Sequence, residues 1–193
     1  IVIETPFHIG TLAEVTGYSI SYEQLKDVFI AYQNRIKELK KNTKLKYVLI
    51  YKNQDYGPNF SIIHSHSQVL GLPFIPFGIK QELKNAKEYY SNKKRCIFCD
   101  VIKEELEVEK RIVEKNNNFV AFVPFAPKFP FTLWIFPIEH NCEFLNVRPE
   151  ILIDLARIVK NSFTRICRLL QNPPINLILH NVPNYKPQSG TWQ

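Results

Sequence analysis

The sequence predicts an α+β protein in which antiparallel sheets are covered by amphipathic helices. Two observations support this fold class. Short β-branched and aromatic runs predict strands, whereas two long segments repeat apolar residues every three to four positions and predict helices. In addition, the order strand, helix, strand occurs in each half of the chain, which indicates a duplicated α+β unit.

The first half begins with a predicted strand over residues 2–4. Ser21 and Gln24 then form a capping-box pattern that predicts the start of a helix. The apolar face of this helix carries Leu25, Val28, Phe29, Tyr32, Ile36 and Leu39. Residues 47–51 predict a second strand, and a turn-rich segment leads to a third strand around residues 60–64. This order favours an antiparallel sheet with a helix on one face.

The second half follows a polar, Lys-rich connector that we expect to be helical over residues 81–95. Residues 119–123 and 133–136 predict strands joined by a proline-rich turn. Pro149 lies near the start of a long predicted helix, and residues 175–179 predict a last strand. The apolar face of the long helix carries Leu152, Leu155, Val159, Phe163, Ile166 and Leu169.

The two halves predict two domains, over residues 1–82 and 83–193. The length of 193 residues suffices for one large core or two compact ones. No apolar run approaches the roughly 20 residues of a membrane-spanning helix and no signal peptide opens the sequence, so we expect a cytoplasmic protein. The chain starts at Ile1 within a strand-like run, contains no Met and stops at Gln193 in an aromatic stretch. We therefore expect a fragment whose first domain lacks its start.

Two histidines, His64 and His66, stand one residue apart after the predicted third strand. An imidazole can attack a phosphoryl centre, bind a metal or act as a general base. The amide of Gln68 can bind a phosphate oxygen without adding negative charge, and Ser61 adds a hydroxyl donor. Nothing acidic lies between Ser61 and Ile79, and the net charge of +7 also suits an anionic ligand, although lysine runs commonly form solvated faces. An isolated His-x-His pair is often a surface or core feature, but this compact set favours an anion site.

Among the four cysteines, Cys96 and Cys99 form a Cys-x-x-Cys pair. Thiolates at this spacing suit a tetrahedral zinc ion with two further ligands, of which His140 is the obvious third. A redox pair and a pair of small buried hydrophobic residues are the alternative interpretations. His8 follows a strand at the matching place in the first half and can pair with His64. The sequence therefore predicts one or two metal sites.

The segment from Asn53 to Pro76 resembles the galactose-1-phosphate uridylyltransferases and ADP-glucose phosphorylases, which belong to the histidine-triad superfamily. The resemblance rests on Ser61-Ile62-Ile63-His64-Ser65-His66-Ser67-Gln68 and on Gly71-Leu72-Pro73. In the second half, Cys96-Ile97-Phe98-Cys99-Asp100-Val101-Ile102 resembles the start of many histidine-triad domains. Residues 119–140 resemble the carboxy-terminal uridylyltransferase domain. The resemblance implies two histidine-triad-like domains, each an antiparallel sheet with packed helices.

The resemblance also implies a ping-pong reaction. His66 would attack the α-phosphate of a nucleoside diphosphate sugar and pass the nucleotidyl group to a sugar phosphate or to phosphate. Gln68 would bind the phosphate during the transfer, and Ser61 would contact the departing or incoming phosphate. Asn53 matches an asparagine of the nucleotide or phosphate site. Family members are commonly dimers, so we expect a homodimer without nucleic-acid or membrane partners.

The metal ligands that the resemblance implies fall into two groups. His8 and His64 match family zinc ligands, whose usual partners are a cysteine pair farther upstream. Cys96, Cys99 and His140 match a second zinc site of the ADP-glucose phosphorylase type. One further residue, His180, matches a histidine that binds metal in some members.

The sequence departs from the family pattern at Ser65, where proline is usual, and at Asp55 and Asn59, where glycines are common. Three functions remain open: a nucleotidyltransferase, a histidine-triad hydrolase of nucleotides, and a non-catalytic, zinc-stabilised nucleotide-binding module. Gln68 favours the transferase, because the hydrolases usually carry a third histidine there. The Cys-x-x-Cys pair favours the ADP-sugar phosphorylase type over the uridylyltransferase type.

Overall fold

The structure is a computed structural model of the chain and describes residues 1–8, 12–13, 19–54 and 64–184. Its elements in chain order are β1 (Val2–Ile3), α1 (Tyr22–Lys40), β2 (Tyr47–Gln54), β3 (His66–Leu72), α2 (Phe77–Lys93), α3 (Ile97–Val108), β4 (Ile112–Lys115), β5 (Phe119–Phe122), β6 (Trp134–Pro137), the 3-10 turn η1 (Phe144–Asn146), α4 (Pro149–Leu170) and β7 (Ile175–Leu179). The predicted α+β class is confirmed. Ser61, Asp55 and Asn59 lie outside the described residues.

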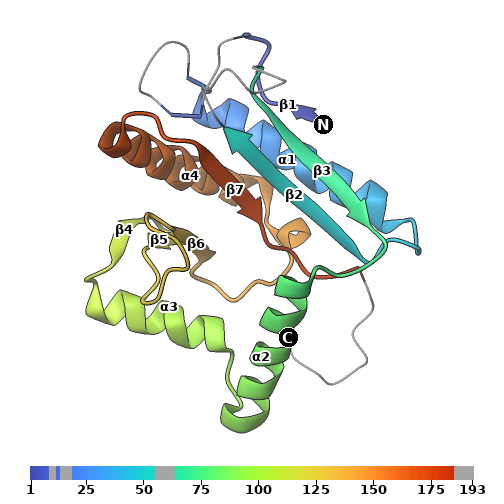
Figure 1. Cartoon of the computed structure of the whole chain (residues 1–193), viewed down its shortest axis with the longest axis vertical. Coiled ribbons are helices and arrows are strands. Elements are labelled where there is room, and N and C mark those ends of the chain that lie inside the picture. The colour runs from blue at the N-terminus through green and yellow to red at the C-terminus, as the bar shows by residue number, and fades with distance from the viewer. Residues whose placement is uncertain (9–11, 14–18, 55–63, 185–193) are drawn as a thin grey trace.

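Two antiparallel sheets organise these elements. The larger has the strand order β1-β3-β2-β7, and the smaller has the order β4-β5-β6. Strand β7 pairs antiparallel with β2, with Leu179 opposite Ile50 and Ile175 opposite Gln54. A strand from the second half therefore completes the sheet of the first half, as Figure 1 shows. The predicted boundary after residue 82 falls within α2, and the division into two domains stays a prediction.

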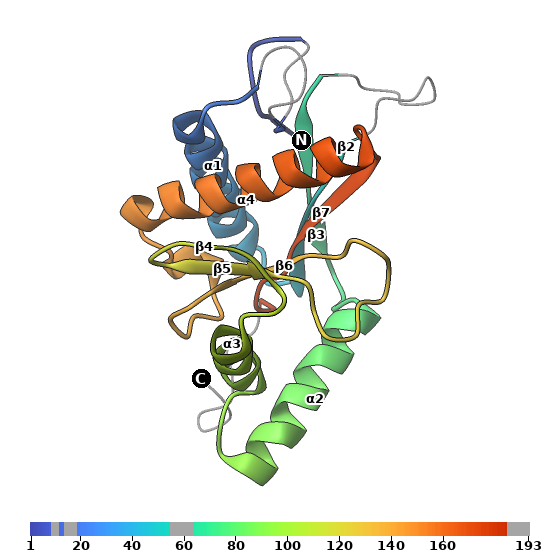
Figure 2. The same cartoon turned by 90° about the vertical axis from the view of Figure 1, so that its left-hand side faces the viewer.

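Both long helices cover one side of the larger sheet (Figure 2). The Ser21 hydroxyl accepts the backbone N–H of Gln24 at 3.1 Å, which confirms the predicted cap of α1. Pro149 stands in the first turn of α4, as predicted, where its missing N–H costs no hydrogen bond. The main core joins the two helices to β2 through Leu25, Val28, Phe29, Tyr32, Ile36, Val48, Ile50, Leu152, Ala156, Val159 and Phe163.

The strand alternation separates the two sides of the larger sheet. Ile50 and its cross-strand partner Val69 pack against the helix-covered core, so this side is buried. Tyr51 and its partner Gln68 point to the other side, because successive side chains alternate. Asn53 and His66 lie two residues from Tyr51 and Gln68 along their strands, so they share the same side of the sheet. We call this side, with Tyr51, Asn53, His66 and Gln68, the open face.

The smaller sheet is held by two apolar clusters. Ile102 of α3 packs with Val120 and Phe122 of β5. On the other side of that strand, Phe119 and Ala121 pack with Ile158 of α4. The smaller sheet is thereby attached to the helix that also covers the larger sheet.

The predicted third strand, around residues 60–64, lies largely outside the described residues. Strand β3 is described from His66 onward, so His64 precedes it and His66 is its first residue. Helix α3 and strand β4, which follow the connector predicted over residues 81–95, were not predicted. Lys94 adopts a left-handed conformation with φ 57°, which ends α2 and allows a second helix to start at Ile97. Among the helices of the described residues, none has the length and apolarity to cross a membrane.

Candidate functional site

The imidazole of His66 is held by the backbone of the residues before it. Its Nδ1 atom lies 2.8 Å from the carbonyl oxygen of His64. Because a carbonyl only accepts hydrogen bonds, Nδ1 of the neutral ring carries the proton and Nε2 keeps the lone pair. His66 is 8% exposed, so little of the ring is solvated. A neutral ring with a fixed tautomer and a free Nε2 is suited to nucleophilic attack.

Gln68 stands two residues further along the same face of β3. The hydroxyl of Tyr51 donates a hydrogen bond to Oε1 of Gln68 at 2.8 Å. This bond occupies the acceptor end of the amide and leaves its Nε2 group as a donor. Asn53, exposed on β2, adds a second amide to the open face. The structure therefore brings His66 and Gln68 onto one side of β3 and places Asn53 on the same side of the sheet.

The two histidines predicted to share a metal lie side by side. The rings of His8 and His64 contact each other edge-on, with centroids 5.4 Å apart and planes at 78°. Nε2 of His64 lies 2.6 Å from the carbonyl oxygen of Thr5, so it carries the proton and Nδ1 remains free to bind a metal. Within the described part of the chain, no third histidine, cysteine or carboxylate completes a cluster with them. The structure thus brings the two predicted ligands into contact, and their binding of a metal stays a prediction.

Cys96, Cys99 and His140 form a group that could hold a metal ion, with ligand atoms all within 4.8 Å of one another. The two cysteines stand at the start of α3, and the thiol of Cys99 lies 3.0 Å from Nδ1 of His140. Burial, and next the neighbouring Cys96 thiol, raises the pKa of Cys99 to about 11. A cation at this place would favour the thiolate forms instead. Two thiols and one imidazole fit three corners of a tetrahedral zinc site.

His180 follows β7 and contacts a different partner. Its Nδ1 atom lies 3.0 Å from a carboxylate oxygen of Glu82 on α2. This hydrogen bond raises the pKa of His180 above its ordinary value. Among the described residues, His180 is not part of the metal-binding group. The contact between His180 and Glu82 is an ion pair when the imidazole is protonated. Metal binding by His180 stays a prediction.

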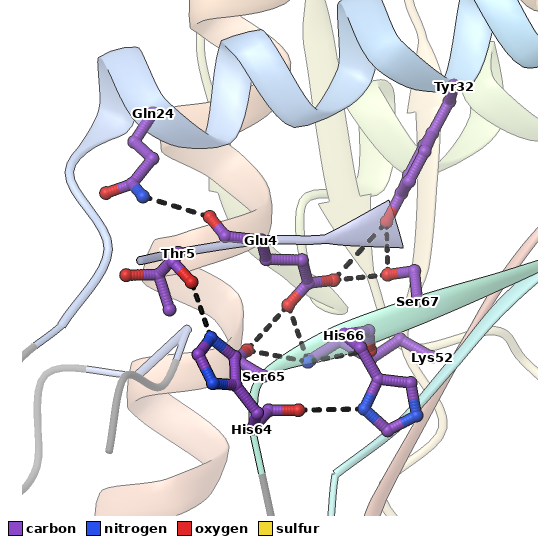
Figure 3. Close-up of polar contacts among 9 residues, drawn as sticks. All are labelled: Glu4, Thr5, Gln24, Tyr32, Lys52, His64, Ser65, His66 and Ser67. Carbon is purple, nitrogen blue, oxygen red and sulfur yellow. Dashed lines mark hydrogen bonds and ion pairs between the residues drawn. The ribbon is translucent and has the colours of Figure 1, made fainter. Parts of the chain in front are cut away.

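A second polar cluster lies beneath β3, on the side covered by α1, and was not predicted. Lys52 and Glu4 form a buried ion pair with 2.7 Å between Nζ and Oε2 and side chains 3% and 1% exposed. Figure 3 shows Glu4 between β3 and the helix that carries Tyr32. Burial and the Glu4 carboxylate raise the pKa of Tyr32, so its hydroxyl stays protonated.

The sequence contained a signal for this cluster. Lys52 alternates in phase with Val48 and Ile50, which places a lysine on the buried side of β2. A buried lysine requires a carboxylate partner, because an unpaired buried charge costs several kcal/mol. The strand pattern alone does not identify that partner, since Glu4 is 48 residues away.

The sequence is similar to known sugar-nucleotide transferases and phosphorylases. Residues 1–76 match the family profile of the galactose-1-phosphate uridyl transferase N-terminal domain. The ADP-glucose phosphorylase of Arabidopsis thaliana is 30% identical over 183 residues, which cover 95% of this chain and 49% of that protein. The chain is similar to these enzymes. The galactose-1-phosphate uridylyltransferase of Haemophilus influenzae is 26% identical over 190 residues, covering 98% of this chain and 52% of the relative.

Solved structures of similar proteins have the same fold as this chain. The crystal structure of the Arabidopsis thaliana ADP-glucose phosphorylase with bound ADP-glucose superimposes with a TM-score of 0.86 at 28% identity. The match covers 97% of this chain and 57% of that one. A uridylyltransferase structure matches with a TM-score of 0.86, also at 28% identity, over 96% of this chain and 57% of the other. The predicted resemblance is confirmed, and the chain spans about half the length of the curated relatives it matches.

Proposed function

We propose that this chain carries the catalytic histidine of a nucleotidyltransferase that acts on a nucleoside diphosphate sugar. The observation that carries the proposal is the hydrogen bond between Nδ1 of His66 and the His64 carbonyl, which leaves Nε2 free. The relatives named ADP-glucose phosphorylase and galactose-1-phosphate uridylyltransferase support the substrate class. Attack on phosphorus by a neutral imidazole is the chemistry that this arrangement serves.

The proposed reaction has two displacements. In the first, the Nε2 lone pair of His66 forms a bond to the α-phosphorus, and the bond to the sugar phosphate breaks with its electrons leaving on that oxygen. In the second, an oxygen of phosphate or of a sugar phosphate attacks the same phosphorus, and Nε2 regains its lone pair. The Nδ1 proton remains bonded to the His64 carbonyl, which stabilises the positive charge that the ring gains during attack.

The neighbouring residues would bind the phosphate. Gln68 would donate its Nε2–H to a phosphate oxygen, because Tyr51 already occupies the other end of the amide. Asn53 would contribute a further amide from the adjacent strand. We assign Ser61 the phosphate contact that the family resemblance implies. None of these groups is anionic, which suits a ligand that brings its own negative charge.

We further propose zinc as the metal of the Cys96, Cys99 and His140 group, with His8 and His64 as ligands of a second site. Zinc bound by thiolates and imidazoles supplies a structural crosslink without redox chemistry. The first group would join the start of α3 to the segment that follows β6, because Cys96 and Cys99 lie at the former and His140 at the latter. A homodimer in the cytoplasm remains our expectation for the whole protein.

The direct test uses the whole protein with radiolabelled ADP-glucose and, separately, UDP-glucose. Either the adenylyl or the uridylyl label should become covalently attached, and adding phosphate or hexose 1-phosphate should release it as a new nucleotide. Phosphate as the faster acceptor would identify the ADP-sugar phosphorylase type. Release to water at the same rate would instead identify a hydrolase. Binding without any covalent label, in a folded and metal-loaded sample, would identify a non-catalytic module.

A further inference from the structure

The buried pair of Glu4 and Lys52 is a charged feature beside His66 that the proposed reaction leaves unused. An ammonium group has three donors, and all three of Lys52 are bonded. They go to Oε2 of Glu4 at 2.7 Å, to the hydroxyl of Ser65 at 3.1 Å and to the carbonyl oxygen of His66 at 3.3 Å. Lys52 therefore connects the carboxylate directly to the backbone of the candidate nucleophile (Figure 3).

The carboxylate of Glu4 is equally well satisfied. Oε2 accepts the hydroxyl of Ser65 at 2.6 Å in addition to Lys52. Oε1 accepts the hydroxyl of Ser67, which also contacts the Tyr32 hydroxyl. Glu4 after β1, Tyr32 of α1 and Lys52 of β2 thus contact Ser65 and Ser67, the two serines that flank His66. A buried polar network in which every member is satisfied is rigid.

The backbone of the same segment reinforces this arrangement. The N–H of Glu4 donates to the carbonyl oxygen of Ser65 at 3.0 Å. The next carbonyl, that of Thr5, holds the ring of His64 at 2.6 Å. The His64 carbonyl that accepts the hydrogen bond from Nδ1 of His66 therefore lies in a segment that is held on both sides. Movement of Glu4 would be transmitted to the atom that sets the tautomer of His66.

Stability alone is a weak explanation for such a pair. Removing two charges from water is costly, and apolar residues of similar volume often stabilise a protein as well or better. A fixed geometry is what a charged network adds to an apolar core. Ser65 is part of this network, because its hydroxyl bonds both Lys52 and Glu4.

We propose that Glu4 and Lys52 are positioning residues, which hold the backbone of residues 64–66 so that His66 keeps its Nδ1 proton and aims Nε2. Their effect on transfer rests on the proposed function, whereas their effect on the tautomer does not. Displacing a reacting group by about 1 Å can lower a rate by about 100-fold. The network therefore matters for the chemical step more than for ligand binding.

The test compares Lys52→Met and the double substitution Glu4→Gln/Lys52→Met with the wild-type protein. The double variant removes both charges with little change in volume, so that it folds even where a single change leaves one charge buried. The matched control is Glu105→Gln, because Glu105 is also 3% exposed and bonded to a cation, Arg111, at 3.0 Å, but belongs to α3. Long-range proton–nitrogen spectra of histidine-labelled protein report which ring nitrogen of His66 carries the proton.

We expect single-turnover labelling of His66 by saturating sugar nucleotide to fall about 10- to 100-fold in both variants. The dissociation constant of the sugar nucleotide should change by no more than about twofold. The His66 spectrum should change from the Nδ1–H tautomer to a mixture, and Glu105→Gln should retain the wild-type rate and spectrum. A folded double variant with the wild-type tautomer overturns the proposal, whatever its rate. If the wild-type protein itself forms no adduct, the proposed function fails and the spectra alone decide the positioning role.

Discussion

Nδ1 of His66 lies 2.8 Å from the carbonyl oxygen of His64, so the backbone of one histidine fixes the proton of the next. The ring of His64 makes a separate contact, with Nε2 2.6 Å from the Thr5 carbonyl oxygen. The two histidines of the pair are therefore not equivalent. His66 presents a free nitrogen on the open face, whereas His64 anchors the segment that leads into β3.

Replacing His64 tests this division. His64→Ala removes the donor to the buried Thr5 carbonyl, so we expect the free energy of unfolding to fall by about 1–3 kcal/mol. Chemical denaturation measures that change. A His64→Ala protein as stable as the wild type would contradict the anchoring role. Any loss of activity in this variant should accompany the loss of stability or metal, because its ring does not face the phosphate.

Tyr51 orients Gln68 and gives a second prediction. Tyr51→Phe removes one hydrogen bond worth about 1 kcal/mol, so transfer should slow about fivefold. Gln68→Ala removes the phosphate donor itself and should slow transfer by about 100-fold. Tyr89→Phe is the control, because its hydroxyl is likewise bonded, to Asp100 at 2.7 Å, but lies on α2.

The two variants should not be additive. If Tyr51 acts through Gln68, then Tyr51→Phe should have almost no further effect once Gln68 is alanine. Single-turnover rates of the four proteins in the cycle measure the coupling. Full additivity would show that Tyr51 affects the reaction by another route.

The Cys96, Cys99 and His140 group predicts a metal-dependent loss of stability. Cys99→Ser should lower the zinc content by one ion per chain and the melting temperature by about 10 °C or more. Cys142→Ser is the matched control, because Cys142 is an exposed free cysteine of the same half outside the group. Elemental analysis and thermal unfolding measure both effects. Equal zinc content in the two variants would rule out Cys99 as a ligand.

The His180–Glu82 contact predicts a pH dependence. The hydrogen bond to Glu82 raises the pKa of His180, so the protonated ring is favoured in the folded state. The resulting stabilisation is complete below the unfolded pKa of about 6.5 and disappears as the pH rises through the higher folded value. Both side chains are about half-exposed, so the effect should stay below about 1 kcal/mol.

Glu82→Gln should lower the pKa of His180 and reduce this stabilisation at acidic pH. Titration of the His180 ring by NMR measures the first effect, and denaturation at several pH values measures the second. Glu88→Gln serves as the control, since Glu88 is an exposed residue of the same helix and pairs with Lys84. An unchanged His180 titration in Glu82→Gln would show that the contact does not persist in solution.

Much of the secondary structure followed from local patterns in the sequence. The capping residues Ser21 and Gln24, and Pro149 at the first turn of α4, predicted both long helices because their effects depend on neighbours within one turn. The last strand, β7, was predicted over the residues that form it, Ile175–Leu179. Its place beside β2 was not predicted, because strand alternation specifies a face and not a partner.

In the candidate site, too, residues close in sequence were predicted together, whereas the contact between two distant residues was not. The spacing of Cys96 and Cys99 predicted a metal-binding pair, and the structure brings His140 to it. The contact of Glu4 with Lys52 was missed, because the strand pattern places Lys52 on the buried side of β2 but does not identify a partner 48 residues away.

The most direct test of the central claim is to locate the nucleotidyl group after the wild-type protein reacts with sugar nucleotide in the absence of an acceptor. The adduct is quenched in alkali, where a phosphoramidate survives, and the labelled peptide is sequenced by mass spectrometry. We predict the label on His66, and no label in His66→Ala with His64 intact. A label on His64, or an equal yield of adduct from His66→Ala, would contradict the account.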